Sequence, residues 1–103
     1  MALIDTDPQG SLASWWNERI NETPLFAQVE ISKLTEHLQA LAKGGIKLAI
    51  IDTPPSVTDM IQQVLRTADR VLIPTRPSPH DLRAVGSTVE LVENAGKRMI
   101  FVI

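Results

Sequence analysis

Cysteine is absent from all 103 residues, so neither a disulfide framework nor a thiolate metal site can form. That absence fits an intracellular protein. An excess of basic residues is also absent, because the chain has 10 Lys and Arg and 12 Asp and Glu, which gives a formal net charge of -2. No block of consecutive basic residues occurs. The chain as a whole is therefore not an electrostatic match for nucleic acid, which leaves only a local basic face open to it.

Long apolar runs and a leader segment are missing as well. The hydrophobic runs are only a few residues long, and the first residues lack the basic and apolar regions of a signal peptide. We therefore expect a cytoplasmic protein with no membrane partner. The rest is ordinary for a globular chain, with 44% hydrophobic and 21% charged residues, and the length allows a single domain over residues 1–103.

Short runs of consecutive apolar residues predict strands that are buried on both faces. These runs are Ala2 to Ile4, Lys47 to Ile51, Arg70 to Ile73 and Arg98 to Ile103. Between them, apolar residues at intervals of three and four predict helices, with stripes that begin at Ile31, Val57 and Leu82. Strands that alternate with helices predict a parallel sheet. The expected fold class is α/β, a partial parallel sheet flanked by helices.

Capping residues agree with these boundaries. Ser56 lies three residues before Asp59, and Ser78 is followed by Pro79, so each serine marks an expected helix start. Expected helix ends are marked by Gly44, Gly45 and Gly96.

The segment from residue 11 to 30 has the least regular pattern. Leu12 to Ile20 is interpreted as a short helix and Pro24 to Val29 as a minor strand or a loop. Trp15 and Trp16 are adjacent, so they cannot both face the same core.

Polar residues gather where three of the predicted strands end. Asp5 and Asp7 follow the first strand, Asp52 follows the second, and the Pro-Thr-Arg-Pro-Ser stretch 74–78 follows the third. Parallel strands bind ligands at their carboxyl edge, where carboxylates beside hydroxyls and helix N-termini suit a hydrated divalent cation and a phosphate. Asp5 and Asp7 are also compatible with a plain turn, and Asp52 with a cap of the next helix.

Three stretches together resemble motifs of the ParA/MinD group of deviant P-loop ATPases, and within it ParA-type partition proteins. LIDTDPQGS resembles the second acidic motif of that family, LAIIDTPPS its Walker B strand, and VLIPTRPSPHDLRAV the strand and helix that come next. The motifs occur in the family's order over nearly the whole chain. The resemblance implies a three-layer α/β/α P-loop fold, of which residues 1–103 would be a single incomplete ATPase domain.

The resemblance also implies roles for individual residues. Asp7 would orient or polarise the attacking water, Asp5 would support the Mg²⁺ shell, and Asp52 would hold the metal through water. Phosphoryl transfer asks a protein mainly for positioning and charge neutralisation, which fits such carboxylates. Further contacts to ATP would come from Gln9, Gly10, Thr53 and Pro74.

At the level of the whole protein, the resemblance implies ATP-dependent segregation or positioning of plasmid or chromosomal DNA. It implies a nucleotide-sandwich homodimer, a ParB-like partner that stimulates slow ATP hydrolysis, and non-specific DNA binding.

The family's glycine-rich phosphate loop, K-G-G-x-G-K-[ST], does not occur in these residues. KGGIK at Lys43 to Lys47 lacks the later glycine and the hydroxyl, and it precedes a strand, so we interpret it as a helix end. In the family, the strand before that loop lies in mid-sheet, between the strands that end here at Asp52 and Pro74. We therefore expect an internal fragment with a central gap, free strand edges that favour self-association, and little or no ATP binding by these residues alone.

Two other function classes stay open. A phosphoryl-receiver signalling domain has a similar layout, with Asp52 as acceptor beside Asp5, Asp7 and Thr75, but it needs a lysine after its last strand, whereas Lys97 precedes that strand. A non-catalytic assembly module that pairs with full-length relatives is the other alternative.

Overall fold

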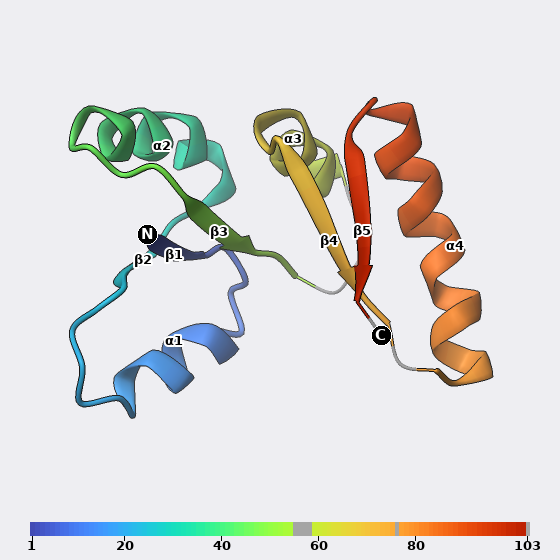
Figure 1. Ribbon diagram of the computed structural model, residues 1–103, viewed down its shortest axis with the longest axis horizontal. Coiled ribbons are helices and arrows are strands. Elements are labelled where there is room, and N and C mark those ends of the chain that lie inside the picture. Colours follow the sequence, from blue (N-terminus) through green and yellow to red (C-terminus); the bar gives the residue numbers. More distant parts are fainter. Residues whose placement is uncertain (55–58, 76, 103) are drawn as a thin grey trace. The chain divides into compact units, whose positions relative to one another are not determined.

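The chain forms two compact units, Met1–Pro55 and Ser56–Ile103 (Figure 1). The computed structural model describes residues 1–54, 59–75 and 77–102. Each unit combines parallel strands with helices, so the α/β fold class predicted from the sequence is confirmed. The expected helix cap at Ser56 lies outside the described residues.

The first unit contains a three-stranded parallel sheet in the order β2-β1-β3. Its elements are β1 (Ala2–Asp5), α1 (Ser11–Asn17), β2 (Leu25–Gln28), the 3-10 helix η1 (Ile31–Lys33), α2 (Leu34–Lys43) and β3 (Ala49–Asp52). The short helix and the minor strand expected between residues 11 and 30 are both present.

Strand β1 is the centre of this unit, because all four of its residues are buried. The helices α1 and α2 lie on opposite sides of it (Figure 1). Ile4 is fully buried, and Ala13 of α1 and Leu34 of α2 are buried as well. The prediction of a strand covered on both faces is therefore correct for β1.

Aromatic side chains attach α1 to the sheet. The Trp16 ring stacks on Phe26 of β2 with the ring centroids 5.5 Å apart. Its neighbour Trp15 remains 48% exposed, and the Arg19 guanidinium lies 4.8 Å from the centre of the Trp15 ring. The same guanidinium lies 5.4 Å from the centre of the Trp16 ring, so the two tryptophans share Arg19 and only Trp16 packs on the sheet.

The glycine pair after α2 ends that helix. Gly44 is its C-cap, and Gly45 takes a left-handed φ of 87°. The Ile46 N–H then donates to the Leu41 carbonyl at 3.0 Å, as in a helix-terminating turn. The interpretation of KGGIK as a helix end is confirmed.

The second unit contains two parallel strands and two helices: α3 (Asp59–Thr67), β4 (Arg70–Pro74), α4 (Pro79–Asn94) and β5 (Arg98–Val102). The helix α4 begins at the proline after Ser78, as the sequence predicted. The core of this unit is formed by Leu65 of α3, Ile73 of β4 and Val92 of α4. Both helices therefore pack on the sheet face that carries Ile73.

The other face of the β4-β5 pair is open, and here the expectation of strands buried on both faces is wrong. Leu72 is 59% exposed, and Ile100 and Val102 are 46% and 50% exposed, while Phe101, the register partner of Ile73, is also 50% exposed. In β3 as well, Ile50 is 42% exposed. Consecutive apolar residues predicted these strands correctly but did not predict which of their faces are buried. Burial of a face depends on the helices that pack on it.

Within the described residues, β3 and β4 are not paired, and the strands form two separate sheets. No helix in the described part of the chain is long and apolar enough to cross a membrane. The single-domain organisation stays a prediction.

Gly10 provides a first test of the fold, because it has a left-handed φ of 68° at the start of α1. We expect Gly10→Ala to destabilise the chain by about 1 to 2 kcal/mol, since a Cβ disfavours that conformation. A Cβ there would also lie 3.3 Å from Gln28 Nε2. Urea denaturation measures the change.

The matched control is Gly86→Ala in α4, where a Cβ meets nothing within 4 Å. Alanine in a helix interior should raise the stability by about 1 kcal/mol. Equal effects of the two substitutions would contradict the special role of Gly10.

Candidate functional site

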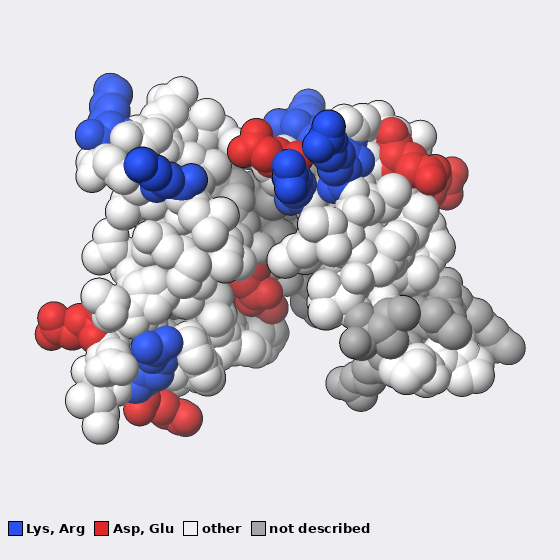
Figure 2. Space-filling model, in the orientation of Figure 1, with Lys and Arg blue, Asp and Glu red and all other residues white. Residues whose placement is uncertain are grey.

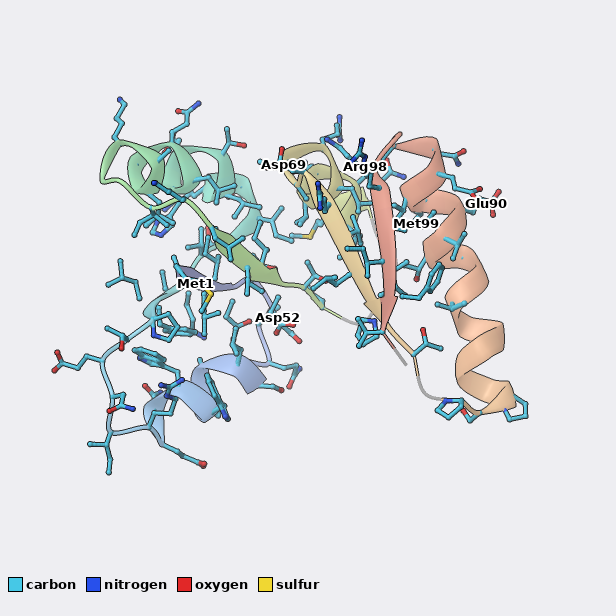
Figure 3. The ribbon with its side chains drawn as sticks, viewed as in Figure 1. Met1, Asp52, Asp69, Glu90, Arg98 and Met99 are labelled. Atoms are coloured by element: carbon cyan, nitrogen blue, oxygen red, sulfur yellow. The ribbon has the colours of Figure 1, made fainter. Side chains whose placement is uncertain are left out.

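The candidate site lies at the carboxyl edge of the three-stranded sheet. Asp5 ends β1 and Asp52 ends β3, and the two residues are direct partners in the parallel register. The turn after β1 adds Asp7, which is half-buried. Figure 3 shows Asp52 where β3 ends. The sequence prediction that these carboxylates converge on one sheet edge is therefore confirmed.

Asp5 is 2% exposed and has a clear structural role. Its Oδ1 accepts the backbone N–H of Asp7 at 3.0 Å, and its Oδ2 accepts that of Ala13 in α1 at 3.0 Å. These bonds hold the turn and the first turn of α1 against the end of β1. These two bonds leave a second lone pair on each carboxylate oxygen, and the side chain is buried.

Asp7 shapes the Pro-Gln-Gly turn that follows. Its Oδ1 accepts the backbone N–H of Gln9 at 2.9 Å, and its carbonyl accepts that of Gly10 at 3.0 Å. The interpretation of Asp5 and Asp7 as turn residues is therefore correct for their hydrogen bonds to the backbone. These bonds do not occupy all the lone pairs of the Asp7 carboxylate, which is partly exposed to solvent.

Thr6, between the two aspartates, fixes the end of β3. Its backbone N–H donates to the Asp52 carbonyl at 3.0 Å, and its Oγ1 donates to the same oxygen at 2.7 Å. Thr6 is only 7% exposed. One residue therefore holds Asp52 in register beside the turn that carries Asp7.

The electrostatics of the site centre on Asp52. Burial, and then the negative charges of Asp5 and Asp7, raise the pKa of the Asp52 carboxyl above its ordinary value of 3.8. The backbone N–H of Thr53 acts in the opposite direction. Three carboxylates thus repel one another across one sheet edge, an arrangement that a bound cation relieves.

Among the residues that the structure describes, no group of three or more His, Cys, Asp or Glu side chains is placed to hold a metal ion between them. The arrangement fits a hydrated cation held through water, with oxygen acceptors around it.

The remaining predicted site residues fall into two groups. Gln9, Gly10 and Thr53 lie in the two loops that follow β1 and β3, beside the aspartates. Pro74 ends β4 in the second unit, which is described separately. Their roles toward a nucleotide stay predictions.

Two residues at this edge were missed by sequence reasoning. Thr6 was passed over because a hydroxyl between two carboxylates gives no sign of which backbone oxygen it will meet. Gln28 ends β2 as the register partner of Asp5, and so extends the row at the carboxyl edge to a third strand. Only the strand order reveals this, because a minor strand carries no motif.

Comparisons with known proteins identify relatives of the chain. It is 41% identical over 90 residues, 84% of the chain, to "Maintenance of carboxysome distribution protein A" of Gloeobacter kilaueensis. It is 36% identical over 100 residues, 94% of the chain, to the protein of the same name from Halothiobacillus neapolitanus.

The chain spans 40% and 46% of the lengths of these curated relatives. No family model matches the chain, and no solved structure matches it at a significant level. The similarity to the two relatives is consistent, at a coarse level, with the ParA/MinD resemblance.

The raised pKa of Asp52 predicts a pH-dependent stability. A carboxyl whose folded-state pKa exceeds its unfolded value destabilises the fold when it is charged, and this cost disappears as pH falls toward 3.8. We therefore expect Asp52→Asn to raise the melting temperature near pH 7, with a gain that shrinks toward acid pH. Thermal unfolding followed by circular dichroism measures it.

Glu22→Gln, at an exposed loop position, is the control and should leave the melting temperature unchanged at every pH. A gain for Asp52→Asn that stayed constant down to acid pH would contradict this electrostatic account.

The Thr6 hydroxyl predicts a second effect. Thr6→Val keeps the shape but removes the bond from Oγ1 to the Asp52 carbonyl, so the free energy of unfolding should fall by about 1 kcal/mol. The matched control is Thr67→Val, which removes a hydroxyl bond within α3 to Gln63 and should change stability by under about 0.5 kcal/mol. Urea denaturation of both variants measures the free energy of unfolding. Equal losses of stability in Thr6→Val and Thr67→Val would argue against a special contact at Thr6.

Proposed function

We propose that the chain is part of a ParA-type positioning ATPase, in which Asp5, Asp7 and Asp52 handle a magnesium ion and water beside a nucleotide. The observation that carries this proposal is the register pairing of Asp5 with Asp52, with Asp7 close enough to raise the pKa of Asp52. The similarity to carboxysome-distribution proteins over most of the chain supports the same family at a coarse level.

Each carboxylate contributes differently to this chemistry. When bound, Mg²⁺-ATP supplies the transferable phosphoryl group and the cation that offsets the negative charge. Asp52, aligned by Thr6, would hold the cation through water. Asp5, fixed by two backbone N–H groups, would support the same cation by its charge. Asp7, which is half-buried, would orient the attacking water.

The cargo and partners form the finer part of the proposal. The relatives' names describe the maintenance of carboxysome distribution, whereas the partition motifs imply plasmid or chromosomal DNA. We propose a positioning role that these cargoes share, with a homodimer, a ParB-like partner and non-specific DNA as the components of the whole protein. Residues 1–103 by themselves should bind ATP poorly, since K-G-G-x-G-K-[ST] does not occur in them.

The phosphoryl-receiver alternative is disfavoured by the position of Lys97. A receiver places a lysine at the carboxyl end of its last strand, but Lys97 precedes β5 and its Nζ donates to the Arg66 carbonyl at 3.3 Å. The lysine therefore lies at the amino end of β5, away from the carboxyl edge that a receiver uses.

Manganese is the probe that tests the proposed cation site. Mn²⁺ accepts the same oxygen ligands as Mg²⁺ and broadens nearby NMR signals. We expect the amide signals of Thr6, Asp7 and Thr53 to broaden first, and Asp52→Asn to weaken Mn²⁺ binding at least about fivefold, since removing one of three charges reduces the attraction. The control Glu22→Gln should bind Mn²⁺ with the same affinity as the unsubstituted chain.

Two outcomes would contradict the proposal. Broadening centred on another acidic surface, such as Glu30 before η1 and Glu36 in α2, would place the cation elsewhere. Phosphorylation of Asp52 by acetyl phosphate would favour the receiver instead.

In the same buffer, calorimetry should detect no stoichiometric binding of ATP to residues 1–103. A clear one-to-one titration would contradict the expected weak ATP binding.

A further inference from the structure

The backbone carbonyls of the acidic edge, which is formed by Asp5, Asp7 and Asp52, are used by the fold itself. The Asp5 carbonyl accepts the N–H of Val29 at 3.0 Å, and the Asp7 carbonyl accepts the N–H of Gly10 at 3.0 Å. One of the two lone pairs on each of these oxygens is therefore already occupied. A carbonyl in such a bond is a poorer ligand for a cation than a free one.

The Asp52 carbonyl is more fully occupied than the other two. It accepts the Thr6 N–H at 3.0 Å and the Thr6 hydroxyl at 2.7 Å, and Thr6 is only 7% exposed. A carbonyl oxygen has two lone pairs, so these two bonds leave none for a cation. Thr6 therefore removes a main-chain ligand that the end of β3 would otherwise offer beside the Asp52 carboxylate.

The carboxylates differ in how much they can offer to a cation. Both oxygens of Asp5 accept backbone N–H groups at 3.0 Å, and this side chain is 2% exposed. Asp7 and Asp52 are half-buried, and each accepts one backbone N–H. Figure 2 shows acidic side chains at the surface of the first unit where β3 ends. The oxygens that water can reach at this edge therefore belong mainly to two carboxylates.

Magnesium and calcium differ in the ligands that they take from a protein. Ca²⁺ is surrounded by about six to eight oxygens, which commonly include backbone carbonyls, whereas Mg²⁺ keeps several waters and needs one or two carboxylates. The negative charge of the edge attracts both ions alike, because each carries the same charge. The number and kind of free oxygens must therefore decide between them. Two carboxylates beside a fully occupied carbonyl match the smaller ion.

We propose that the acidic edge selects Mg²⁺ against Ca²⁺, and that Thr6 is the residue that sets this selectivity. The Thr6 hydroxyl occupies the Asp52 carbonyl and so leaves the carboxylate as the only part of Asp52 that meets the hydrated ion. The inference rests on the proposed cation site, to which it adds the ion that the site accepts. Thr6 is a positioning residue in this account, because it acts through Asp52 and does not touch the cation.

The first test needs no substitution. Residues 1–103 are loaded with Mn²⁺, which takes the same oxygen ligands as Mg²⁺ and broadens nearby NMR signals. Mg²⁺ and Ca²⁺ are then added in separate titrations to displace it. We expect Mg²⁺ to restore the amide signals of Thr6, Asp7 and Thr53 at a concentration about tenfold or more below that of Ca²⁺.

Two substitutions that differ by a single oxygen test the role of Thr6. Thr6→Ser keeps the hydroxyl and should keep the preference for Mg²⁺. Thr6→Ala frees a lone pair of the Asp52 carbonyl, so the ratio of the Ca²⁺ and Mg²⁺ concentrations should fall about threefold or more. A merely structural role would weaken the binding of both ions together and leave this ratio unchanged. The control Thr67→Ala removes a hydroxyl bond within α3 and should also leave the ratio unchanged.

The outcomes that contradict the inference can be told apart. If Mn²⁺ broadens no signal at the acidic edge, the proposed cation site is wrong and its selectivity falls with it. If Mn²⁺ binds there but Ca²⁺ displaces it as readily as Mg²⁺ does, the site stands and the selectivity is wrong. An unchanged ratio in a folded Thr6→Ala variant would show that Thr6 does not set the preference. Circular dichroism verifies the fold, and Thr6→Val, which keeps the shape, replaces Thr6→Ala if that variant unfolds.

Discussion

The parallel pairing of β1 with β3 is the contact on which the candidate site depends. It places Asp5 beside Asp52, and Thr6 then binds the Asp52 carbonyl through both its N–H and its hydroxyl. A shift of one residue in this register would turn Asp52 to the other face of the sheet. The burial of all four β1 residues between α1 and α2 makes such a shift costly, so the core of the first unit also sets the geometry of its acidic edge.

The acidic edge shows how structural and chemical roles combine in the same side chains. Asp5 is nearly inaccessible and satisfies two backbone N–H groups, which is sufficient reason for a carboxylate at that position. The charge it brings nevertheless acts on Asp52, whose pKa rises through burial and through its two acidic neighbours. A turn that needs carboxylates thereby creates a region of negative potential suited to a hydrated cation, and the chain tolerates the repulsion that this involves.

The two units differ in how completely their strands are covered. In the first, helices protect both sides of the central strand, whereas in the second both helices pack against the face that carries Ile73. The remaining face combines exposed apolar side chains with two arginines in register. Such a composition is unusual for a surface in contact with water alone, because exposed apolar area and paired like charges both raise the free energy of the folded chain.

The amino-acid sequence by itself determined the order of strands and helices, the helix ends at Gly44 and Gly96, and the meeting of Asp5, Asp7 and Asp52 at one edge. These follow from local rules, since apolar periodicity, glycine conformations and the common direction of parallel strands need no knowledge of distant contacts. Tertiary structure alone decided that Thr6 binds Asp52, that Gln28 joins the row beside Asp5, and that Leu72 and Ile100 stay exposed. Each of those features depends on which distant segment lies beside a residue. A hydrophobic pattern shows that a side chain is apolar, but it does not show which segment, if any, buries that side chain.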